Sequence, residues 1–159
     1  MTNKKSIDPQ KIRFSDIVVL ENSYHVNDEY RKSNSSINSF LYDIGTSDFK
    51  VNKEQNQVNF RLEIHIKGQN ENDSTELGIA RFNIEFFYNV KNLVDFTSES
   101  GENNESKIDL SLGTTIAALS FSTARGMIYQ SLANTAFHRV ILPVIKPAEL
   151  LRNNKNVKF

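Results

Sequence analysis

Hydrophobic and polar residues alternate most regularly in two neighbouring segments, 57–67 and 75–90. A period of two places successive side chains on opposite faces of a β-strand, so both segments predict strands with one buried and one solvated face. The polar loop 68–74, of sequence GQNENDS, joins them as a hairpin. The predicted inward positions are Val58, Phe60, Leu62, Ile64 and Ile66 in the first strand and Ala80, Phe82, Ile84, Phe86 and Tyr88 in the second.

Two more strands are expected earlier in the chain, after a flexible N-terminus of residues 1–11. The first covers 12–24, and its continuous apolar run 17–20 indicates partial burial on both faces. The second covers 37–51, with a bulge or bend at Gly45-Thr46. The polar loop 25–36 between them is long for a compact domain, which is typical of a functional or crossing segment.

The last third of the chain changes to a helical period after the polar loop 95–109, in which we expect no core residues. One stripe runs through Ile116, Leu119, Thr123, Met127 and Ser131, and neighbouring apolar residues broaden it. The opposite side has no Glu–Lys pairs, and small residues recur along the helix, so a second copy of the chain could approach closely. The residues expected at such an oligomer interface are Ile116, Ala117, Ser120, Ala124, Met127 and Ile128.

An apolar connector, 137–147, follows the long helix, and its two prolines exclude a central strand or another long helix. Pro147 suits the first turn of a short helix that ends near residue 153. The predicted fold is therefore α+β, with a four-stranded antiparallel sheet and one long and one short helix packed on one face. We expect one domain, 12–151, and a basic C-terminal tail, 152–159.

The forty residues from Leu112 to Leu151 resemble the C-terminal half of the SecB protein-export chaperones. The similarity includes the initial Leu-Gly, Phe121, Phe137, Leu142 and Leu150, and the order of the four strands extends it over 12–151. It implies an ATP-independent holdase for unfolded or precursor polypeptides, assembled as a homotetrameric dimer of dimers. In this family a crossover loop containing a tryptophan helps to wall the client-binding cleft. This chain has no tryptophan, so Tyr24 and Tyr30 are the nearest substitutes.

The predicted apolar and aromatic surface exceeds what one long helix can cover. Such a surface suits extended, non-native segments, which gain from apolar burial and backbone pairing with little dependence on sequence. The residues expected to touch clients are Tyr24, Tyr30, Phe40, Tyr42, Phe60, Phe82, Phe86, Phe137, Val140, Ile141, Leu142, Val144, Ile145, Leu150 and Leu151.

Signals of catalysis or cofactor binding are missing from the sequence. His25, His65 and His138 have no metal-ligand spacing, there is no cysteine, and no nucleotide-binding or hydrolase motif occurs. Glu63 and Glu85 could pair as acid and base, but they lie on the solvated strand face, where neither pKa would shift. We therefore expect neither an enzyme nor a bound metal or cofactor. The competing class, a small-ligand-binding or hydrolytic α+β domain, requires a closed pocket with converging polar groups.

The net charge of zero hides an asymmetry of −5 over residues 1–109 and +5 over the residues after Asp109. No aromatic interleaving accompanies the basic residues, so nucleic-acid binding is not expected. No apolar run is long enough to span a membrane, and MTNKKSIDPQ lacks the apolar core of a secretory signal, so we expect a cytoplasmic protein without membrane contact.

The charge pattern also concerns the SecA motor, which SecB proteins contact through an acidic sheet surface and an acidic tail. The tail of this chain is basic, and its solvated strand face carries both signs. A contact that depends on negative charge in the tail would here meet positive charge instead, so we expect weak or absent SecA binding. The clients would then lie elsewhere, for example an antitoxin, as for SecB-like members of toxin–antitoxin systems. The residues of the strand face are Asn59, Arg61, Glu63, His65, Lys67, Arg81, Asn83 and Glu85.

Overall fold

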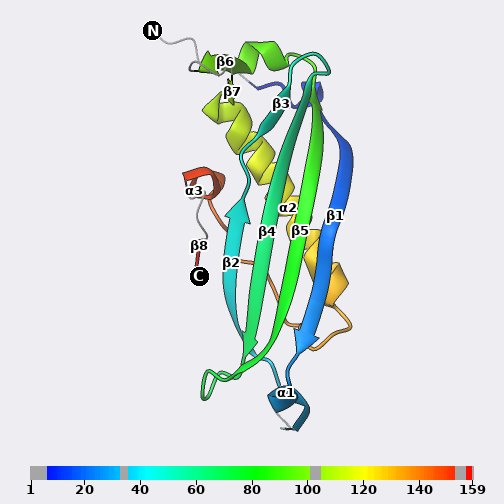
Figure 1. The fold of residues 1–159 in the computed structure, drawn as a ribbon, viewed down its shortest axis with the longest axis vertical. Coiled ribbons are helices and arrows are strands. Elements are labelled where there is room, and N and C mark those ends of the chain that lie inside the picture. Colours follow the sequence, from blue (N-terminus) through cyan, green and yellow to red (C-terminus); the bar gives the residue numbers. More distant parts are fainter. Residues whose placement is uncertain (1–6, 33–35, 101–104, 153–156, 159) are drawn as a thin grey trace.

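A long, twisted antiparallel sheet with one long helix across one face forms the molecule (Figure 1). The computed structural model describes residues 7–32, 36–100, 105–152 and 157–158. Its elements are η1 (Pro9–Lys11), β1 (Ile12–Val26), α1 (Asp28–Lys32), β2 (Ser39–Thr46), β3 (Lys50–Asn52), β4 (Gln57–Gln69), β5 (Glu76–Val90), η2 (Leu93–Phe96), β6 (Thr97–Ser100), β7 (Glu105–Ile108), α2 (Leu110–Leu132), α3 (Pro147–Arg152) and β8 (Val157–Lys158).

The central pair of strands, β4 and β5, confirms the alternation seen in the sequence. All ten predicted inward residues of these two strands are at most 3% exposed. The register pairs Val58 with Tyr88 and Phe60 with Phe86, so apolar side chains meet across the strands on the face that α2 covers. This double row forms the centre of the hydrophobic core.

The main sheet contains more strands than the four expected. Its order is β1-β5-β4-β2-β8, and the short β3 also pairs with β4. The predicted strand 37–51 divides into β2 and β3, because residues 47–49 lie opposite only two residues of β4 and interrupt the ladder. Ser47 bridges the interruption: its hydroxyl accepts a hydrogen bond from the Arg61 N–H (3.2 Å), and its own N–H donates to the Arg61 carbonyl (3.1 Å).

The long helix α2 begins at Leu110, because Asp109 caps it by accepting a hydrogen bond from the Ser111 N–H (2.8 Å). Its buried face agrees with the prediction at Ile116 and at the neighbouring apolar residues that broaden the stripe, but Leu119 is 39% exposed and Ser131 is exposed. The buried residues of α2 pack against the sheet and connector. They are Leu112, Gly113, Ile116, Ala117, Ser120, Phe121, Ala124, Ile128 and Leu132.

Three segments expected to be irregular contain secondary structure. The loop 95–109 holds the antiparallel hairpin β6–β7, and Phe96 at its base is buried. The loop 25–36 contains α1, in which the Asn27 side chain accepts a hydrogen bond from the Tyr30 N–H (3.0 Å). In the expected flexible N-terminus, η1 follows a capping Asp8, while residues 1–6 lie outside the described part.

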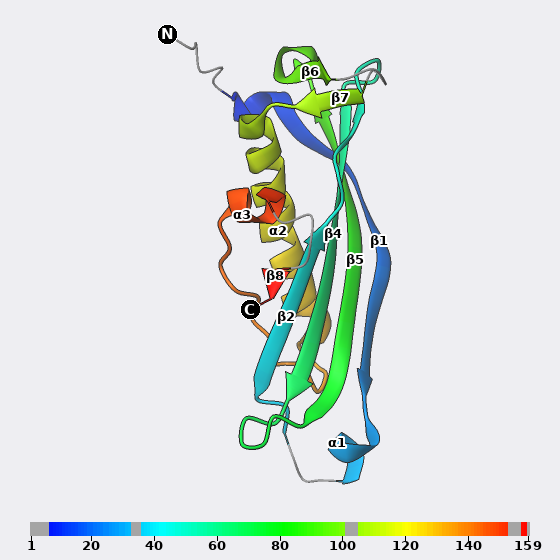
Figure 2. The same ribbon diagram turned by 60° about the vertical axis from the view of Figure 1, so that its left-hand side comes forward.

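The two helices lie on the same side of the sheet, as predicted. Figure 2 shows α3 beside α2, and the Thr46 hydroxyl on β2 donates to the Leu150 carbonyl of α3 (3.3 Å). The connector is extended from Val140 to Lys146, but its first residues, from Phe137 to Arg139, form turns. In the basic tail, residues 157–158 form β8, and residues 153–156 and 159 lie outside the described residues.

Candidate functional site

Four of the aromatic residues predicted to touch clients form a continuous row across the inner face of the sheet. Phe137 lies 6.4 Å, between ring centroids, from both Tyr24 on β1 and Phe40 on β2, and Phe40 lies 6.5 Å from Tyr42. The Tyr42 hydroxyl donates a hydrogen bond to the Ile141 carbonyl (3.0 Å). Burial raises the pKa of Tyr42 above its ordinary value of 10.0, so the hydroxyl remains a neutral donor at physiological pH. The aromatic row therefore connects β1 to the connector.

Phe137 is the anchor of the aromatic row, and two facing glycines make room for it. Gly68 and Gly78 are paired on β4 and β5. A β-carbon on Gly78 would lie 2.5 Å from the His25 carbonyl oxygen and 3.2 Å from Phe137, and one on Gly68 would lie 3.0 Å from Phe137 and 2.6 Å from Ile37. The bare backbone thus lets the fully buried Phe137 ring lie directly on the sheet. The sequence shows both glycines, but only the register reveals that they face each other.

The other predicted client residues divide into an exposed and a buried group. Tyr24 is 52%, Ile141 66% and Val144 85% exposed. The partly buried residues are Tyr30, Phe40, Tyr42 and Leu151. The buried residues, at most 6% exposed, are Phe60, Phe82, Phe86, Phe137, Val140, Leu142, Ile145 and Leu150. This last group forms the chain's own core, so in this conformation it presents no surface to a client.

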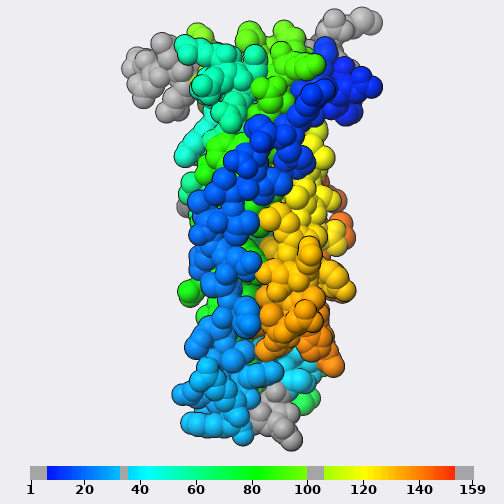
Figure 3. Space-filling model, turned by 90° about the vertical axis from the view of Figure 1, so that its right-hand side faces the viewer, coloured from blue at the N-terminus to red at the C-terminus, as the bar shows by residue number. Residues whose placement is uncertain are grey.

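Sequence reasoning missed an apolar surface along β1. Phe14 is 43% and Val19 45% exposed, although their register partners on β5, Tyr88 and Ile84, are buried. Both side chains lie on the sheet face that α2 covers, but α2 leaves them partly exposed. It contacts β1 near its own C-terminal end, where the Ser131 hydroxyl donates a hydrogen bond to Oδ1 of Asn22 (3.0 Å). Figure 3 shows β1 in blue along the flank of the molecule, with the yellow and orange part of α2 beside it. The sequence signal for this surface was the apolar run 17–20, because four consecutive apolar residues place apolar side chains on both faces of a strand.

The predicted oligomer residues lie mostly inside the chain. Ile116, Ala117, Ser120, Ala124 and Ile128 are at most 1% exposed, and Met127 packs against the core. They contact the chain's own sheet and connector rather than solvent. The exposed face of α2 is instead formed by Leu119, Ser122, Gly126 and Tyr129.

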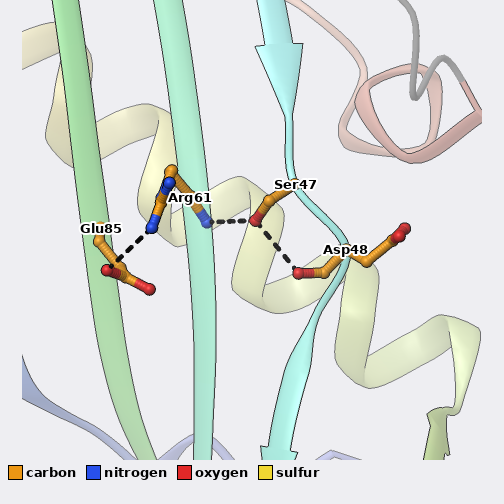
Figure 4. A network of polar contacts seen from close by, with 4 residues as sticks. All are labelled: Ser47, Asp48, Arg61 and Glu85. Carbon is orange, nitrogen blue, oxygen red and sulfur yellow. Dashed lines mark hydrogen bonds and ion pairs between the residues drawn. The ribbon is translucent and has the colours of Figure 1, made fainter. Parts of the chain in front are cut away.

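The opposite, polar face of the sheet carries the ion pair that replaces the suspected acid–base pair. Glu85 faces Arg61, with 3.4 Å between Oε2 and Nη2 (Figure 4). Glu63 is instead paired in register with Asn83. The two carboxylates are therefore not opposite each other. Among the described residues no cluster of three His, Asp or Glu side chains could hold a metal ion, and no described helix is long and apolar enough to cross a membrane.

A hollow of about 850 Å³ lies beside α3 and the β6–β7 hairpin. Its lining combines apolar and polar side chains, and Leu151 is its one contribution from the predicted client residues. Its ionisable lining residues are one aspartate, Asp48, and one lysine, Lys107. The lining residues are Asp48, Phe49, Val51, Ser106, Lys107, Ile108 and Leu151.

Comparison with known proteins identifies the fold. No family model and no curated protein matches the chain. The structure is similar to that of the Mycobacterium tuberculosis Rv1957 SecB-like chaperone in complex with a ChAD peptide from the Rv1956 HigA1 antitoxin. The TM-score is 0.56 at 13% identity, over 86% of this chain and 91% of that chain. A protein of unknown function from Streptococcus agalactiae gives a TM-score of 0.34 at 11% identity, over 84% and 96%. The first similarity shows a SecB-like fold; the second is too low to support an argument.

Proposed function

We propose that this chain is an ATP-independent chaperone that holds non-native polypeptides. The observation that carries the proposal is the exposed apolar surface at both ends of the aromatic row, with Tyr24 on β1 and Ile141 and Val144 on the connector. Exposed apolar groups that a buried aromatic framework holds in place mark a binding surface. The SecB-like fold supports the same interpretation, because the similar Rv1957 protein binds a peptide.

Aggregation of a denatured client, followed by light scattering without nucleotide, tests the proposal. We expect the wild-type protein to suppress aggregation at equimolar concentration. Replacing Ile141 and Val144 by serine should weaken client binding by about tenfold or more, because each aliphatic side chain contributes about 1.5–3 kcal/mol when it becomes buried.

The matched control is Val94→Ser, which removes an equally exposed valine (63%) from η2, away from the aromatic row. This variant should keep full activity. A wild-type protein that fails to delay aggregation would exclude the holdase function. Equal loss of activity in the control and in the connector variant would show that the binding surface lies elsewhere.

A specific client, such as an antitoxin, is favoured over general export. The polar face of the sheet pairs charges of both signs, for example Arg61 with Glu85 and Lys67 with Glu76, and so offers no continuous acidic surface. We expect no salt-resistant binding to SecA, because the negative field that would attract it is absent from this face. Titration against SecA from the same organism, at low and at physiological salt, measures this. Sub-micromolar affinity that survived the added salt would favour export instead.

The proposal includes assembly into a dimer of dimers. Two surfaces of the described chain suit contact with a second copy: the outer edge of β1, and the exposed face of α2 around Gly126. Apart from its chain neighbours and the nearby backbone of α2 itself, no atom lies within 4 Å of the β-carbon position of Gly126, so a neighbouring helix could approach there.

A further inference from the structure

The outer edge of β2 is occupied by the chain's own C-terminal strand. β2 is paired with β4 along its length on one side, and on the other side β8 pairs with it antiparallel at two positions. Lys158 lies opposite Asp43 and Val157 opposite Ile44. A sheet edge offers unpaired N–H and C=O groups to any extended segment, so β2 can accept a further strand at this place.

Two hydrogen bonds define the limits of this part of the edge. The Tyr42 hydroxyl donates to the Ile141 carbonyl (3.0 Å), and the Thr46 hydroxyl donates to the Leu150 carbonyl (3.3 Å). The connector and α3 are thus attached to β2 on both sides of Ile44, and β8 lies between the two attachments (Figure 2). We call residues 42–46 of β2, with the adjacent residues 141–150, the β2 window.

The β2 window has the surface properties of a peptide-docking edge. Ile141 and Val144, which belong to the connector part of the window, are 66% and 85% exposed. An incoming strand would therefore find apolar contacts as well as backbone groups. One carboxylate oxygen of Asp43 is shielded from solvent and has no hydrogen-bond partner among the described residues, so it can accept a donor from such a strand.

We infer that β8 is a displaceable occupant of the β2 window and that extended segments of clients pair with β2 in its place. This inference rests on the proposed holdase function. A two-residue strand provides few ladder hydrogen bonds, and it competes because its attachment to the same chain gives it a high effective concentration. A longer client strand forms more backbone hydrogen bonds and adds alternate side-chain contacts, as in other cases of β-strand addition. The tail therefore lowers the apparent affinity for weak clients and is released by strong ones.

Anisotropy titrations with a fluorescein-labelled, permanently unfolded polypeptide test this competition. Two variants remove the occupant: truncation after Arg152, and Val157→Pro, which keeps the length of the tail but disrupts strand pairing. Both should bind about three- to tenfold more tightly than the wild type, because the fraction of molecules with an open window rises. Lys155→Ser is the control for tail charge and should bind like the wild type.

Hydrogen exchange on the peptide that covers residues 42–46 gives an independent readout. Without client, exchange should be faster in both occupant-free variants than in the wild type, and added client should slow it again in all three proteins. Equal affinities of the truncated and wild-type proteins, or no client-induced protection of β2, would overturn the inference and leave the holdase proposal intact. Absence of client binding in every variant would instead overturn the proposed function itself.

Discussion

A single buried hydroxyl pair lies in the middle of the interface between sheet and helix. Tyr88 on β5 is fully buried, and its hydroxyl is 2.7 Å from that of Ser120 on α2. Each group gives the other the hydrogen-bond partner that a buried polar atom needs. Burial raises the pKa of Tyr88 well above its ordinary value of 10.0, and the hydrogen bond to Ser120 only partly opposes this effect. Ser120 is therefore a core residue, although small size and position on the helix suggested an intermolecular contact.

This raised pKa predicts a loss of stability in alkaline solution. In the unfolded chain Tyr88 ionises near pH 10, whereas in the folded chain it keeps its proton, so the folded state binds more protons above that pH. The contribution is fully present below pH 10 and decreases by roughly 1.4 kcal/mol per pH unit above it. Tyr88→Phe lacks this dependence and costs about 1 kcal/mol at neutral pH, because Ser120 loses its partner.

Urea unfolding of the two proteins at pH 8 and at pH 11 measures the difference. The other four tyrosines are present in both proteins, so their effects cancel in the comparison. The stability difference between wild type and variant should shrink or reverse at pH 11. Parallel loss of stability in both proteins would contradict the assignment.

At the scale of elements, the sequence predicted strands better than helix faces. β4 and β5 were clear because most inward residues, such as Phe60 or Ile84, have polar neighbours on both sides. The buried face of α2 was predicted only in part, because Leu119 lies on its exposed side and the period of apolar residues fits two adjacent stripes. The partners that decide between them, Tyr88 and the β4–β5 core, become visible only after folding.

Short polar elements escaped the prediction for two different reasons. The strands of the β6–β7 hairpin, with sequences TSES and ESKI, contain almost no apolar residue, so no periodicity could reveal them. The helix α1 did carry a signal: Asn27 precedes two acidic residues, and two basic residues follow in its last turn. This is the charge order that the helix dipole favours.

The candidate site was predictable as a region but not by residue, because Val140 and Ile141 are both aliphatic, yet Val140 is buried and Ile141 is exposed.

At the scale of the whole molecule, one helix is too narrow to cover the sheet. β1 is paired with β5 on one side, and no described strand pairs with its other edge. Phe14, Val19, Leu20 and Tyr24 remain 43–52% exposed along this strand. A fifteen-residue edge with apolar side chains promotes association unless something covers it, and a second copy of the same strand is the simplest cover. The exposed face of α2 offers a second, separate contact.

These two surfaces predict an assembly that can be dismantled stepwise. The wild-type protein should show two or four times its chain mass of 18.2 kDa in light scattering at micromolar concentration. Leu20→Lys places a charge on the β1 edge. Tyr129→Glu places a charge on the exposed face of α2, where the Tyr129 side chain is 58% exposed. Each change should remove one interface without unfolding the chain, because both side chains lie on the surface.

For a dimer of dimers, either single variant should halve the mass, and the double variant should be a monomer with an unchanged circular dichroism spectrum. Ala124→Leu provides the contrast, because Ala124 is fully buried within the chain. It should lower the free energy of unfolding by about 1–3 kcal/mol through overpacking, with no direct effect on assembly. A wild-type species of 18.2 kDa would refute assembly altogether. If Ala124→Leu lost assembly without losing stability, the oligomer interface would lie on the face of α2 that was first predicted from the sequence.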